Sequence, residues 1–381
     1  MHTQHLSPGL EGVVAAETRI TEVDGTAGRL VIAGFELSEL AGHATFEEMI
    51  SLLWHDELPD REALAQLQHR LAHLRTAPDI AIQLLASAAE QRLSVMDALL
   101  MAAPTLRLGQ HEAGSSEPLS LALRIVACLP TLVAAYWRLL QGAEPVSPRE
   151  DLGHAANYLY MLSGCDPSAA QTHALDTYLC TVADHGLNAS TFTARVIVST
   201  RSDILSAVVG ALGALKGPLH GGAPGPALDM VFEIGTAERA ETYLRAALAR
   251  GERLMGFGHR IYKVRDPRAD VLAAAASQLY EKDGDRELYK LALQVEQTAL
   301  QLLEELKPGR DLHTNVEFYT ALLLHGIGLP TDLFAPTFAL GRAAGWIAHC
   351  FEQQRADSLI RPQSTYVGPH GRKWAPVEQR Q

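Results

Sequence analysis

The sequence predicts an almost entirely α-helical protein, and three observations support that fold class. Apolar residues recur at helical spacing, as in Leu64, Leu67, Leu71 and Leu74, which are three, four and three positions apart and therefore share one helix face. Prolines, beginning with Pro59, separate successive stretches of this kind, as residues that end helices do. Outside one short segment near the start of the chain, apolar and polar residues do not alternate over any length.

That short segment is expected to form the first elements, the two strands of a small N-terminal β-hairpin. In TRITEVDGTAGRLVIAGF, residues 18–35, two β-type runs flank the dipeptide Asp24-Gly25, which is typical of hairpin turns.

Helices are expected from there onward. In ATFEEMISLLWHDELP, residues 44–59, Thr45 and Glu48 have the spacing of a capping box, which predicts a helix start at Phe46. Phe46, Met49, Ile50 and Leu53 then share a face. The later helices follow the same logic.

The character of the chain changes over residues 223–319. This segment carries amphipathic, charged helices such as 286–309, whereas the runs on either side of it are rich in small apolar residues on all faces. A helix that is apolar all round must be buried in a core or in a subunit interface. We therefore expect a large domain of residues 1–222 and 320–381, an inserted small domain of residues 223–319, and an oligomer interface on the Ala/Gly-rich helices.

Composition excludes several classes of protein. The 381 residues are 47% hydrophobic and 20% charged, as in an ordinary globular protein. A formal net charge of −12 argues against a nucleic-acid-binding protein, which needs a basic surface. The apolar run 119–137 is interrupted by Arg124 and Pro130, so we expect a core helix there and not a membrane span. The first residues do not resemble a secretion signal, and the four cysteines form no CxxC pair, so we expect reduced thiols and a cytoplasmic location.

Four segments have a polar, glycine-rich character that packing alone does not explain. They are ADHGLNASTF with His185, KGPLHGGAP with His220, RLMGFGHRIYKVRDPRAD with His259, and LHTNVEFYTALLLHGIGLP with Glu317. In the third, four cations and one anion occupy the ten residues 259–268 of an otherwise acidic chain. Beside the close backbone access of Gly256 and Gly258, that cluster suits phosphate or carboxylate recognition, although a solvated helix face is the alternative. It is neither a Rossmann fingerprint nor a P-loop.

The residue types point to chemistry at a carbonyl group. The three histidines are far apart and include no HExxH pair, so no metal site is predicted, although one assembled from distant segments stays open. No GxSxG motif of a serine hydrolase is present. Imidazoles, one carboxylate and several guanidinium groups together fit removal of a proton next to a carbonyl, with imidazoles holding the developing enolate oxygen.

Five motifs in order, ADHGLNASTFTARV, GALKGPLHGGA, GFGHRIYKVRDPRAD, NVEFYTALL and RAAGWIAH, resemble the citrate synthase family, including its 2-methylcitrate synthase members. The resemblance extends over nearly the whole chain. It implies a multi-helical homodimer whose small domain closes over the substrate. It also implies condensation of acetyl-CoA with oxaloacetate, followed by hydrolysis of citryl-CoA to citrate and free CoA. The alternatives are 2-methylcitrate synthesis from propionyl-CoA and a non-catalytic paralogue that binds CoA or a dicarboxylate.

The resemblance also implies roles for particular residues. Glu317 matches the base, His220 the donor to the enol oxygen, and His259 the group that polarises the oxaloacetate carbonyl. His185, Arg268 and Arg342 match oxaloacetate-binding positions, and Arg361 matches one donated across the dimer. The CoA site would be formed by Met255, Gly256, Phe257, Gly258, Arg260 and Lys263. Acetyl-CoA would act as a co-substrate, with no permanently bound cofactor, no metal, and no nucleic-acid or membrane partner.

Three residues depart from the common pattern of the family. Glu317 stands where most members have Asp, Gly186 where many have Glu, and Pro224 where Asn is common. One extra methylene moves a carboxylate by about 1 Å, a displacement that can cost roughly a hundredfold in rate unless the backbone compensates. We expect a working enzyme because the carboxylate is retained. His313, His325 and His349, which lie near the motifs, are interpreted as structural or partly exposed.

Overall fold

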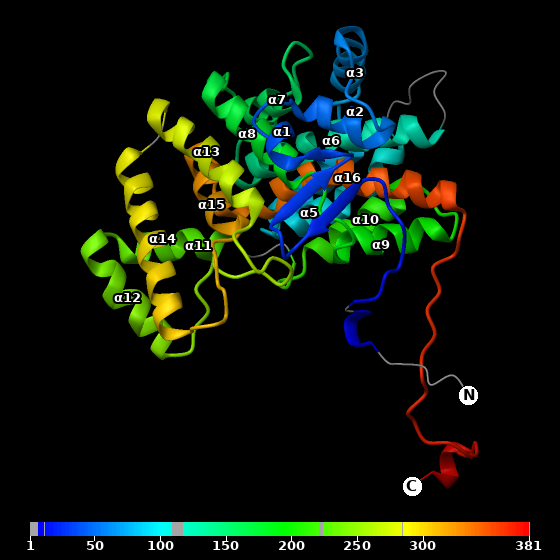
Figure 1. The fold of residues 1–381 in the computed structure, drawn as a ribbon. Helices are drawn as coiled ribbons and strands as arrows, with labels where there is room; N and C mark the ends of the chain where they lie inside the picture. The colour runs from blue at the N-terminus through cyan, green and yellow to red at the C-terminus, as the bar shows by residue number, and fades with distance from the viewer. Residues whose placement is uncertain (1–6, 11, 109–116, 221–223, 284, 381) are drawn as a thin grey trace.

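The computed structural model describes residues 7–10, 12–108, 117–220, 224–283 and 285–380 of the chain (Figure 1). Within them are sixteen α-helices, a few short 3₁₀ turns and one small sheet, which confirms the predicted fold class.

The sheet contains the predicted hairpin and one further strand. Strands β1 (Thr21–Asp24), β2 (Arg29–Ile32) and β3 (Phe35–Glu36) pair antiparallel in that order, with Asp24 opposite Arg29. The Asp24 carboxylate accepts hydrogen bonds from the backbone N–H groups of Thr26 and Ala27, both at 2.9 Å, and so closes the turn. The two-residue β3 is too short for periodicity to reveal.

Eleven of the helices form one body around the buried helix α16 (Phe334–Ala356), which is itself one of the eleven. The other ten are α1 (Leu37–Leu40), α2 (Phe46–His55), α3 (Arg61–His73), α4 (Asp79–Glu90), α5 (Val95–Ala102), α6 (Glu117–Leu140), α7 (His154–Ser163), α8 (Ala169–Val182), α9 (Ala189–Ser199) and α10 (Ile204–Leu215). The predicted capping box of Thr45 and Glu48 starts α2, and its predicted apolar face is buried.

Helix α16 is buried on nearly every side, as its small apolar residues predict. Trp346, Ala343 and Ala344 have no exposed surface. At Gly341 and Gly345 the helix approaches the end of α8 so closely that a Cβ on Gly345 would lie 2.2 Å from the Ala183 carbonyl oxygen. These two glycines therefore bring α16 against the segment that carries His185.

Helix α6 passes the test of length and composition for a membrane-spanning helix over Pro118–Leu140, but 94% of its most apolar window is buried inside the protein. In this fold it is a core helix, as expected, although Pro130 lies inside one continuous helix and does not separate two.

The remaining five helices form the left side of the view in Figure 1. They are α11 (Pro224–Ile234), α12 (Ala237–Ala249), α13 (Pro267–Lys282), α14 (Arg286–Leu306) and α15 (Val316–Gly326). Helices α12 and α14 lie at the outer edge, whereas α13 and α15 pack against α8. The first predicted domain boundary, between residues 222 and 223, lies outside the described residues, and the second falls inside α15. The division into two domains stays a prediction.

The chain beyond α16 leaves the body of the protein (Figure 1). Apolar side chains in this C-terminal segment are exposed, among them Leu359 at 60%, Val367 at 93% and Trp374 at 81%.

Candidate active site

Three helix starts bring the predicted polar residues together. Asn188 caps α9, Asp266 caps α13 and Asn315 caps α15, each by accepting a backbone N–H with its side chain. Short polar side chains at such positions stabilise helix N-termini. The first turns that follow place Ser190, Arg268 and Glu317 at the same region of the molecule, next to the segment 183–188 that holds His185.

A short backbone pairing connects the His259 segment to the Glu317 segment. The Asn315 N–H donates to the Gly256 carbonyl at 2.9 Å, the Gly258 N–H donates to the His313 carbonyl at 2.7 Å, and the Asn315 side-chain amide donates to the Gly258 carbonyl at 2.8 Å. Gly256 has φ of +88°, and a Cβ there would lie 2.9 Å from Phe318. Glycine is needed at this position for packing, whatever ligand it also meets.

The hydrogen bonds of His259 fix its tautomer. Its Nδ1 accepts the backbone N–H groups of Ile261 and Tyr262, both at 3.1 Å, so the proton of the neutral ring is on Nε2. Nε2 lies 3.2 Å from Nη2 of Arg268, and a guanidinium can only donate. Two N–H donors therefore face the same place without an acceptor between them, an arrangement that an anionic or carbonyl oxygen would satisfy.

Charge at this point is controlled by burial and by one ion pair. Arg268 is 4% exposed and makes two hydrogen bonds to Asp266, with Nε–Oδ1 at 3.0 Å and Nη2–Oδ2 at 2.8 Å. Burial raises the pKa of Asp266, but the charge and hydrogen bonds of Arg268 outweigh it and hold that pKa below its usual value. Burial, with Arg268 and Lys263 adding to it, lowers the pKa of His259 to about 4, so this ring is neutral at pH 7.

Glu317, half-buried in the first turn of α15, has the opposite shift. Burial raises the pKa of its carboxyl to about 7, against the opposing effect of the positive charges of Arg268 and Arg342. Its carboxylate has no hydrogen-bond partner within the described ranges. A carboxyl that ionises near neutrality suits a general base.

His220 lies in the turn after α10, and its partner is Ser190. The Ser190 Oγ lies 2.8 Å from Nε2 of His220, and the Ser190 backbone N–H donates to the same nitrogen at 3.4 Å. Nε2 is therefore an acceptor, which leaves the proton on Nδ1. Burial, then the charge of Arg342, lowers the pKa of His220 to about 4. Helix α11 begins four residues later, and Gly221, Gly222 and Ala223 lie outside the described residues.

Arg342 connects His220 to the other groups. It is 1% exposed, donates through Nε to the Val182 carbonyl at 2.7 Å, and lies 4.7 Å above the Phe338 ring. The Phe338 ring that it covers has its centre 6.4 Å from that of the His220 ring, and its charge contributes to the pKa shifts of both Glu317 and His220. Burial lowers the pKa of Arg342 itself to about 10.

His185 completes the cluster from the α8–α9 connection. It is 7% exposed, its Nε2 lies 3.0 Å from the Tyr262 hydroxyl, and its ring centre is 5.9 Å from that of His259. Burial, then the charges of Arg268 and Arg342, lowers its pKa well below the usual value. The structure thus brings together His185, His220, His259, Arg268, Glu317 and Arg342.

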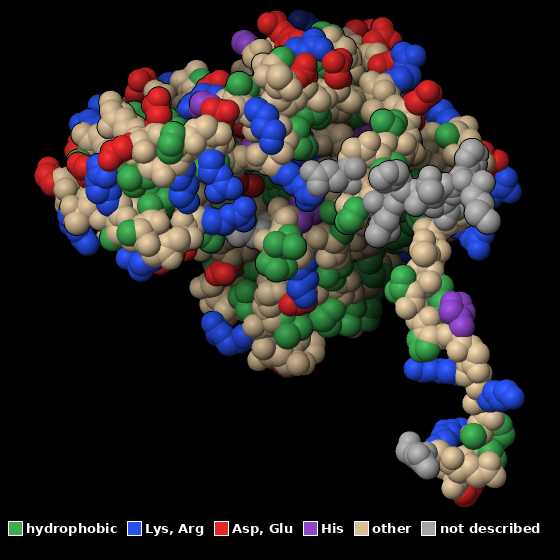
Figure 2. All heavy atoms as spheres, turned by 60° about the horizontal axis from the view of Figure 1, so that its bottom comes forward, with side chains coloured by type: hydrophobic (Ala, Val, Ile, Leu, Met, Phe, Trp, Pro, Cys, Tyr) green, Lys and Arg blue, Asp and Glu red, His purple; other side chains and the backbone are tan. Residues whose placement is uncertain are grey.

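The other predicted residues lie at the margin or apart from the cluster. Met255, Gly256, Phe257 and Gly258 approach it through the pairing with 313–315, whereas Arg260 and Lys263 are exposed. Arg361 is exposed in the segment after α16, outside the cluster of its own chain. The face in Figure 2 is hollowed near its centre, and Lys, Arg and His side chains lie around the hollow.

Sequence reasoning missed three buried polar residues. Ser190 accepts the Trp346 indole N–H at 3.0 Å beside His220, Asp184 lies next to His185, and Tyr262 contacts both His185 and His259. All three are inside the quoted motifs, so their position was a usable signal, but their partners are distant in sequence.

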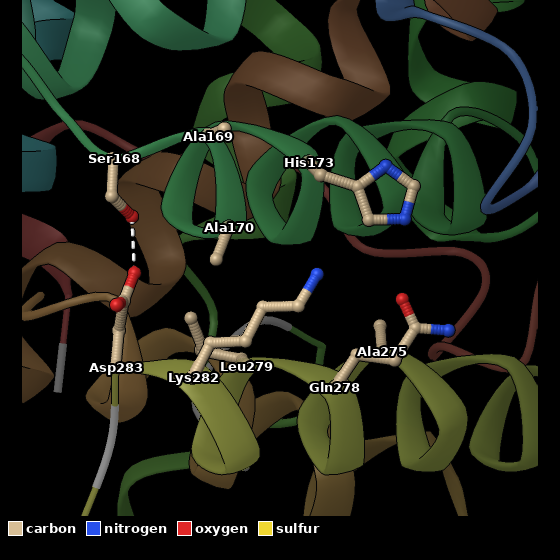
Figure 3. Close-up of a pocket in the computed structure, with 9 residues that line it drawn as sticks. All are labelled: Ser168, Ala169, Ala170, His173, Ala275, Gln278, Leu279, Lys282 and Asp283. Atoms are coloured by element: carbon tan, nitrogen blue, oxygen red, sulfur yellow. Dashed lines mark hydrogen bonds between the residues drawn. The ribbon is translucent and has the colours of Figure 1, made fainter.

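A cavity of about 330 Å³ lies elsewhere, between α8 and α13. In Figure 3 the side chains of Gln278 and Lys282 rise from α13 toward α8, and the Ser168 hydroxyl donates to Asp283. None of the predicted site residues lines it, so we attach no function to it. No three His, Cys, Asp or Glu side chains among the residues with a described position are grouped to hold a metal ion.

Comparison with known proteins gives concordant matches over nearly the full length. The sequence model of the family described as "Citrate synthase, C-terminal domain" matches residues 9–363. Citrate synthase 2 of Bacillus subtilis is 42% identical, with 98% of each chain covered, and a citrate synthase of Haloferax volcanii is 40% identical, with 98% of this chain and 99% of that protein covered. A 2-methylcitrate synthase of Mycobacterium tuberculosis is 36% identical over 95% of this chain and 91% of that protein.

Solved structures agree. A citrate synthase from Pyrobaculum aerophilum superposes with a TM-score of 0.86 at 37% identity, covering 98% of this chain and 95% of that one. The ternary complex of the Thermoplasma acidophilum citrate synthase with carboxymethyl coenzyme A and oxaloacetate superposes with a TM-score of 0.87 at 28% identity, covering 99% and 100%.

Proposed function

The chain belongs to the citrate synthase family, and from that premise we propose that it condenses acetyl-CoA with oxaloacetate to give citrate and free CoA. The observation that carries the proposal is the pair of inward N–H donors on His259 and Arg268 beside a carboxyl whose pKa is about 7. The two donors require an oxygen ligand, and the carboxyl of Glu317 supplies a base that can remove a proton from the methyl group of acetyl-CoA.

The first step is removal of a proton from the methyl group of acetyl-CoA by Glu317. The thioester oxygen becomes an enol oxygen, and Nδ1–H of the neutral His220 donates to it. A neutral imidazole is the suitable donor because it holds its proton at pH 7 and adds no net charge to the buried site. Ser190 orients that ring by occupying Nε2.

The second step joins the enol carbon to the carbonyl carbon of oxaloacetate. Nε2–H of His259 and Nη2 of Arg268 donate to oxaloacetate, His259 to its carbonyl oxygen. As the C–C bond forms, that oxygen gains a proton and becomes the citrate hydroxyl, which balances the proton that Glu317 removed from the methyl group. Arg342 and His185 hold its carboxylates. Water then attacks the thioester carbon of citryl-CoA, the C–S bond breaks, and CoA leaves as the thiol. This scheme uses acetyl-CoA as a co-substrate and calls on no resident metal or cofactor.

The CoA moiety would lie along Met255, Gly256, Phe257 and Gly258, with Arg260 and Lys263 near its phosphates. Both cations are exposed at the rim of the site, as groups that meet a phosphate from solution should be. Gly256 and Gly258 both have positive φ, a backbone conformation that glycine adopts without strain.

The working unit in this proposal is a homodimer in the cytoplasm, with Arg361 of each chain completing the site of the other. Support comes from the exposure of Arg361 and of several large apolar side chains in the segment after α16, which a partner subunit would cover.

The test is direct. Acetyl-CoA and oxaloacetate are added to the purified chain, and free CoA is followed with a thiol reagent. Release that requires both substrates supports the proposal, whereas binding without release would identify a non-catalytic paralogue. Comparing kcat/KM for acetyl-CoA and propionyl-CoA then separates citrate synthesis from 2-methylcitrate synthesis. The two substrates differ by one methylene, for which an apolar pocket gives a preference of about 10- to 200-fold, so the comparison must be quantitative.

A further inference from the structure

A series of buried polar side chains lies next to the segment that holds His185. It runs from Arg195 on α9 through His349 on α16 to Asp184. Nη1 of Arg195 lies 2.9 Å from Nδ1 of His349, and Nε2 of His349 lies 3.2 Å from Oδ1 of Asp184. The side chains of His349 and Asp184 have no exposed surface, and Arg195 is 2% exposed.

The neighbouring donors determine which ring nitrogen of His349 carries the proton. Because a guanidinium can only donate, Nδ1 of His349 accepts from Arg195 and the ring proton is on Nε2, facing Asp184. Nε2 and Oδ1 have no other hydrogen-bond partner within the described residues, so the 3.2 Å contact between them is the only polar contact of either atom there. If either of these two buried polar atoms were removed, the other would be left without a polar partner, which costs free energy.

The other oxygen of Asp184 shapes the backbone around His185. Oδ2 accepts the Gly186 N–H at 2.9 Å and the Thr21 hydroxyl from strand β1. The bond from Gly186 back to Asp184 closes a turn of which His185 is the central residue. The Asp184 carboxylate is thus held by α16 on one side and sets the turn on the other.

Arg195, at the other end of this series of side chains, is held in place by two further residues of α16. Nη1 of Arg195 also contacts Oε2 of Glu352 at 2.5 Å, and its Nε donates to Gln353 at 3.1 Å. The close approach of Gly345 to Ala183 and Asp184 leaves no room for the segment to shift toward α16.

We propose that His349 is a positioning residue for oxaloacetate binding. As a neutral bridge it keeps Asp184 in place, and Asp184 holds the turn that aims His185 at the substrate. The inference rests on the proposed function, since it assigns the ligand of His185 to oxaloacetate. A purely structural role for His349 would change stability alone.

Two substitutions separate the roles. In His349→Gln the amide oxygen still accepts from Arg195 and the amide nitrogen still donates to Asp184, whereas His349→Leu keeps similar volume and removes both bonds. Ile347→Ala is the control, because Ile347 is equally buried on α16 but has no polar contact.

Oxaloacetate affinity of the full-length chain is measured by calorimetry, with kcat and KM for both substrates. Loss of one charge-assisted positioning bond should raise Kd and KM for oxaloacetate about tenfold in His349→Leu, with kcat within about threefold. Glutamine should restore Kd to within about threefold of the unsubstituted chain. Ile347→Ala should lower Tm and leave Kd unchanged.

If His349→Leu does not fold, Thr21→Val provides a second test of whether Asp184 must be held in place, because it removes one hydrogen bond to Asp184 at the edge of the core. It should raise Kd for oxaloacetate about threefold. The inference is wrong if His349→Leu and Thr21→Val bind oxaloacetate normally, or if glutamine binds no better than leucine. If the unsubstituted chain does not bind oxaloacetate, the proposed function is overturned, and this inference with it.

Discussion

At the scale of single residues, burial has opposite effects on the acid and the imidazoles, and both effects favour the proposed reaction. Removing a group from water disfavours its charged form, so the pKa of Glu317 rises to about 7 while those of His220 and His259 fall to about 4. At neutral pH the site therefore contains a base that is partly ionised and two rings that are uncharged donors.

Activity should depend on pH through Glu317 alone in the range from 5 to 8. Because the ionised carboxylate is the active form, kcat/KM should fall about tenfold for each pH unit below about 7, and neither His220 nor His259 should titrate there. The check is a kcat/KM profile in constant ionic strength. A flat profile down to pH 5.5 would show that the base has an ordinary pKa or is another group.

The same shift has a consequence for stability. The folded-state pKa of Glu317 lies above the ordinary value of 4.5, so the folded chain binds a proton that the unfolded chain has lost. The contribution of this group to the free energy of unfolding should therefore decrease as pH rises from 4.5 through 7. Comparing urea unfolding of the unsubstituted chain with Glu317→Gln at pH 5 and pH 8 isolates the effect, because the amide does not titrate. A stability difference between the two proteins that is the same at both pH values would contradict it.

Glu317→Gln should abolish most turnover and keep oxaloacetate binding. The amide has the same shape but cannot take a proton, and a general base contributes about a hundred- to ten-thousandfold in rate. The readouts are kcat from CoA release and oxaloacetate Kd from calorimetry. Full turnover in this variant would move the base to another residue.

At the scale of elements, the N-terminal hairpin supports the segment that holds His259. The Lys263 N–H donates to the Gly25 carbonyl at 2.8 Å, and a Cβ on Gly25 would lie 2.3 Å from the Ile261 carbonyl oxygen. The turn of the hairpin therefore limits where residues 261–263 can lie.

Gly25→Ala should force this contact apart and lower the free energy of unfolding by about 1–3 kcal/mol, the usual cost of overpacking. It should also raise KM for oxaloacetate, because the backbone N–H groups of residues 261 and 262 orient His259. Gln297→Ala is the control, since Gln297 is an exposed residue of α14, and alanine there should change the free energy of unfolding by at most about 0.5 kcal/mol. Denaturant unfolding and steady-state kinetics measure both, and equal effects of the two substitutions would contradict the proposed contact.

At the scale of the whole molecule, the predicted sharing of Arg361 across a dimer can be tested by mixing defective chains. One chain carries Arg361→Ala and the other Glu317→Gln, and each alone should be nearly inactive. If Arg361 serves the opposite site, every mixed dimer has one complete site, so random mixing after denaturation and refolding should restore about a quarter of full activity. Light scattering of the unsubstituted chain gives the oligomeric state. No recovery on mixing, in a sample shown to be dimeric, would place Arg361 in the site of its own chain or outside any site.

The fold class, the hairpin, the start of α2 and the buried character of α16 could all be predicted because each depends on residues close together in the chain. Thr45 and Glu48 specify a helix start within one turn, and Asp24-Gly25 specifies a turn within two residues. The third strand β3 could not be predicted, because two residues are too few to show alternation.

The reactive residues of the candidate site could be predicted, but the buried polar residues that hold them in place could not. His185, His220, His259 and Glu317 stand out because polar residues interrupt apolar runs, and the family resemblance assigned their roles. Ser190, Tyr262 and the Asp184–His349–Arg195 chain were missed because a buried polar side chain reveals its purpose only through its partner. His349 was interpreted as structural for that reason.

By itself, then, the sequence determined the helical fold class, the hairpin, the buried faces of helices such as α2, and which side chains can exchange protons or bind anions. Those properties follow from periodicity, capping and side-chain chemistry, all of which act over a few residues. Only the tertiary structure decided which nitrogen of each imidazole carries its proton and which carboxyl ionises near neutrality. Both depend on donors, charges and the exclusion of water contributed by segments as much as 165 residues apart, from Asp184 to His349.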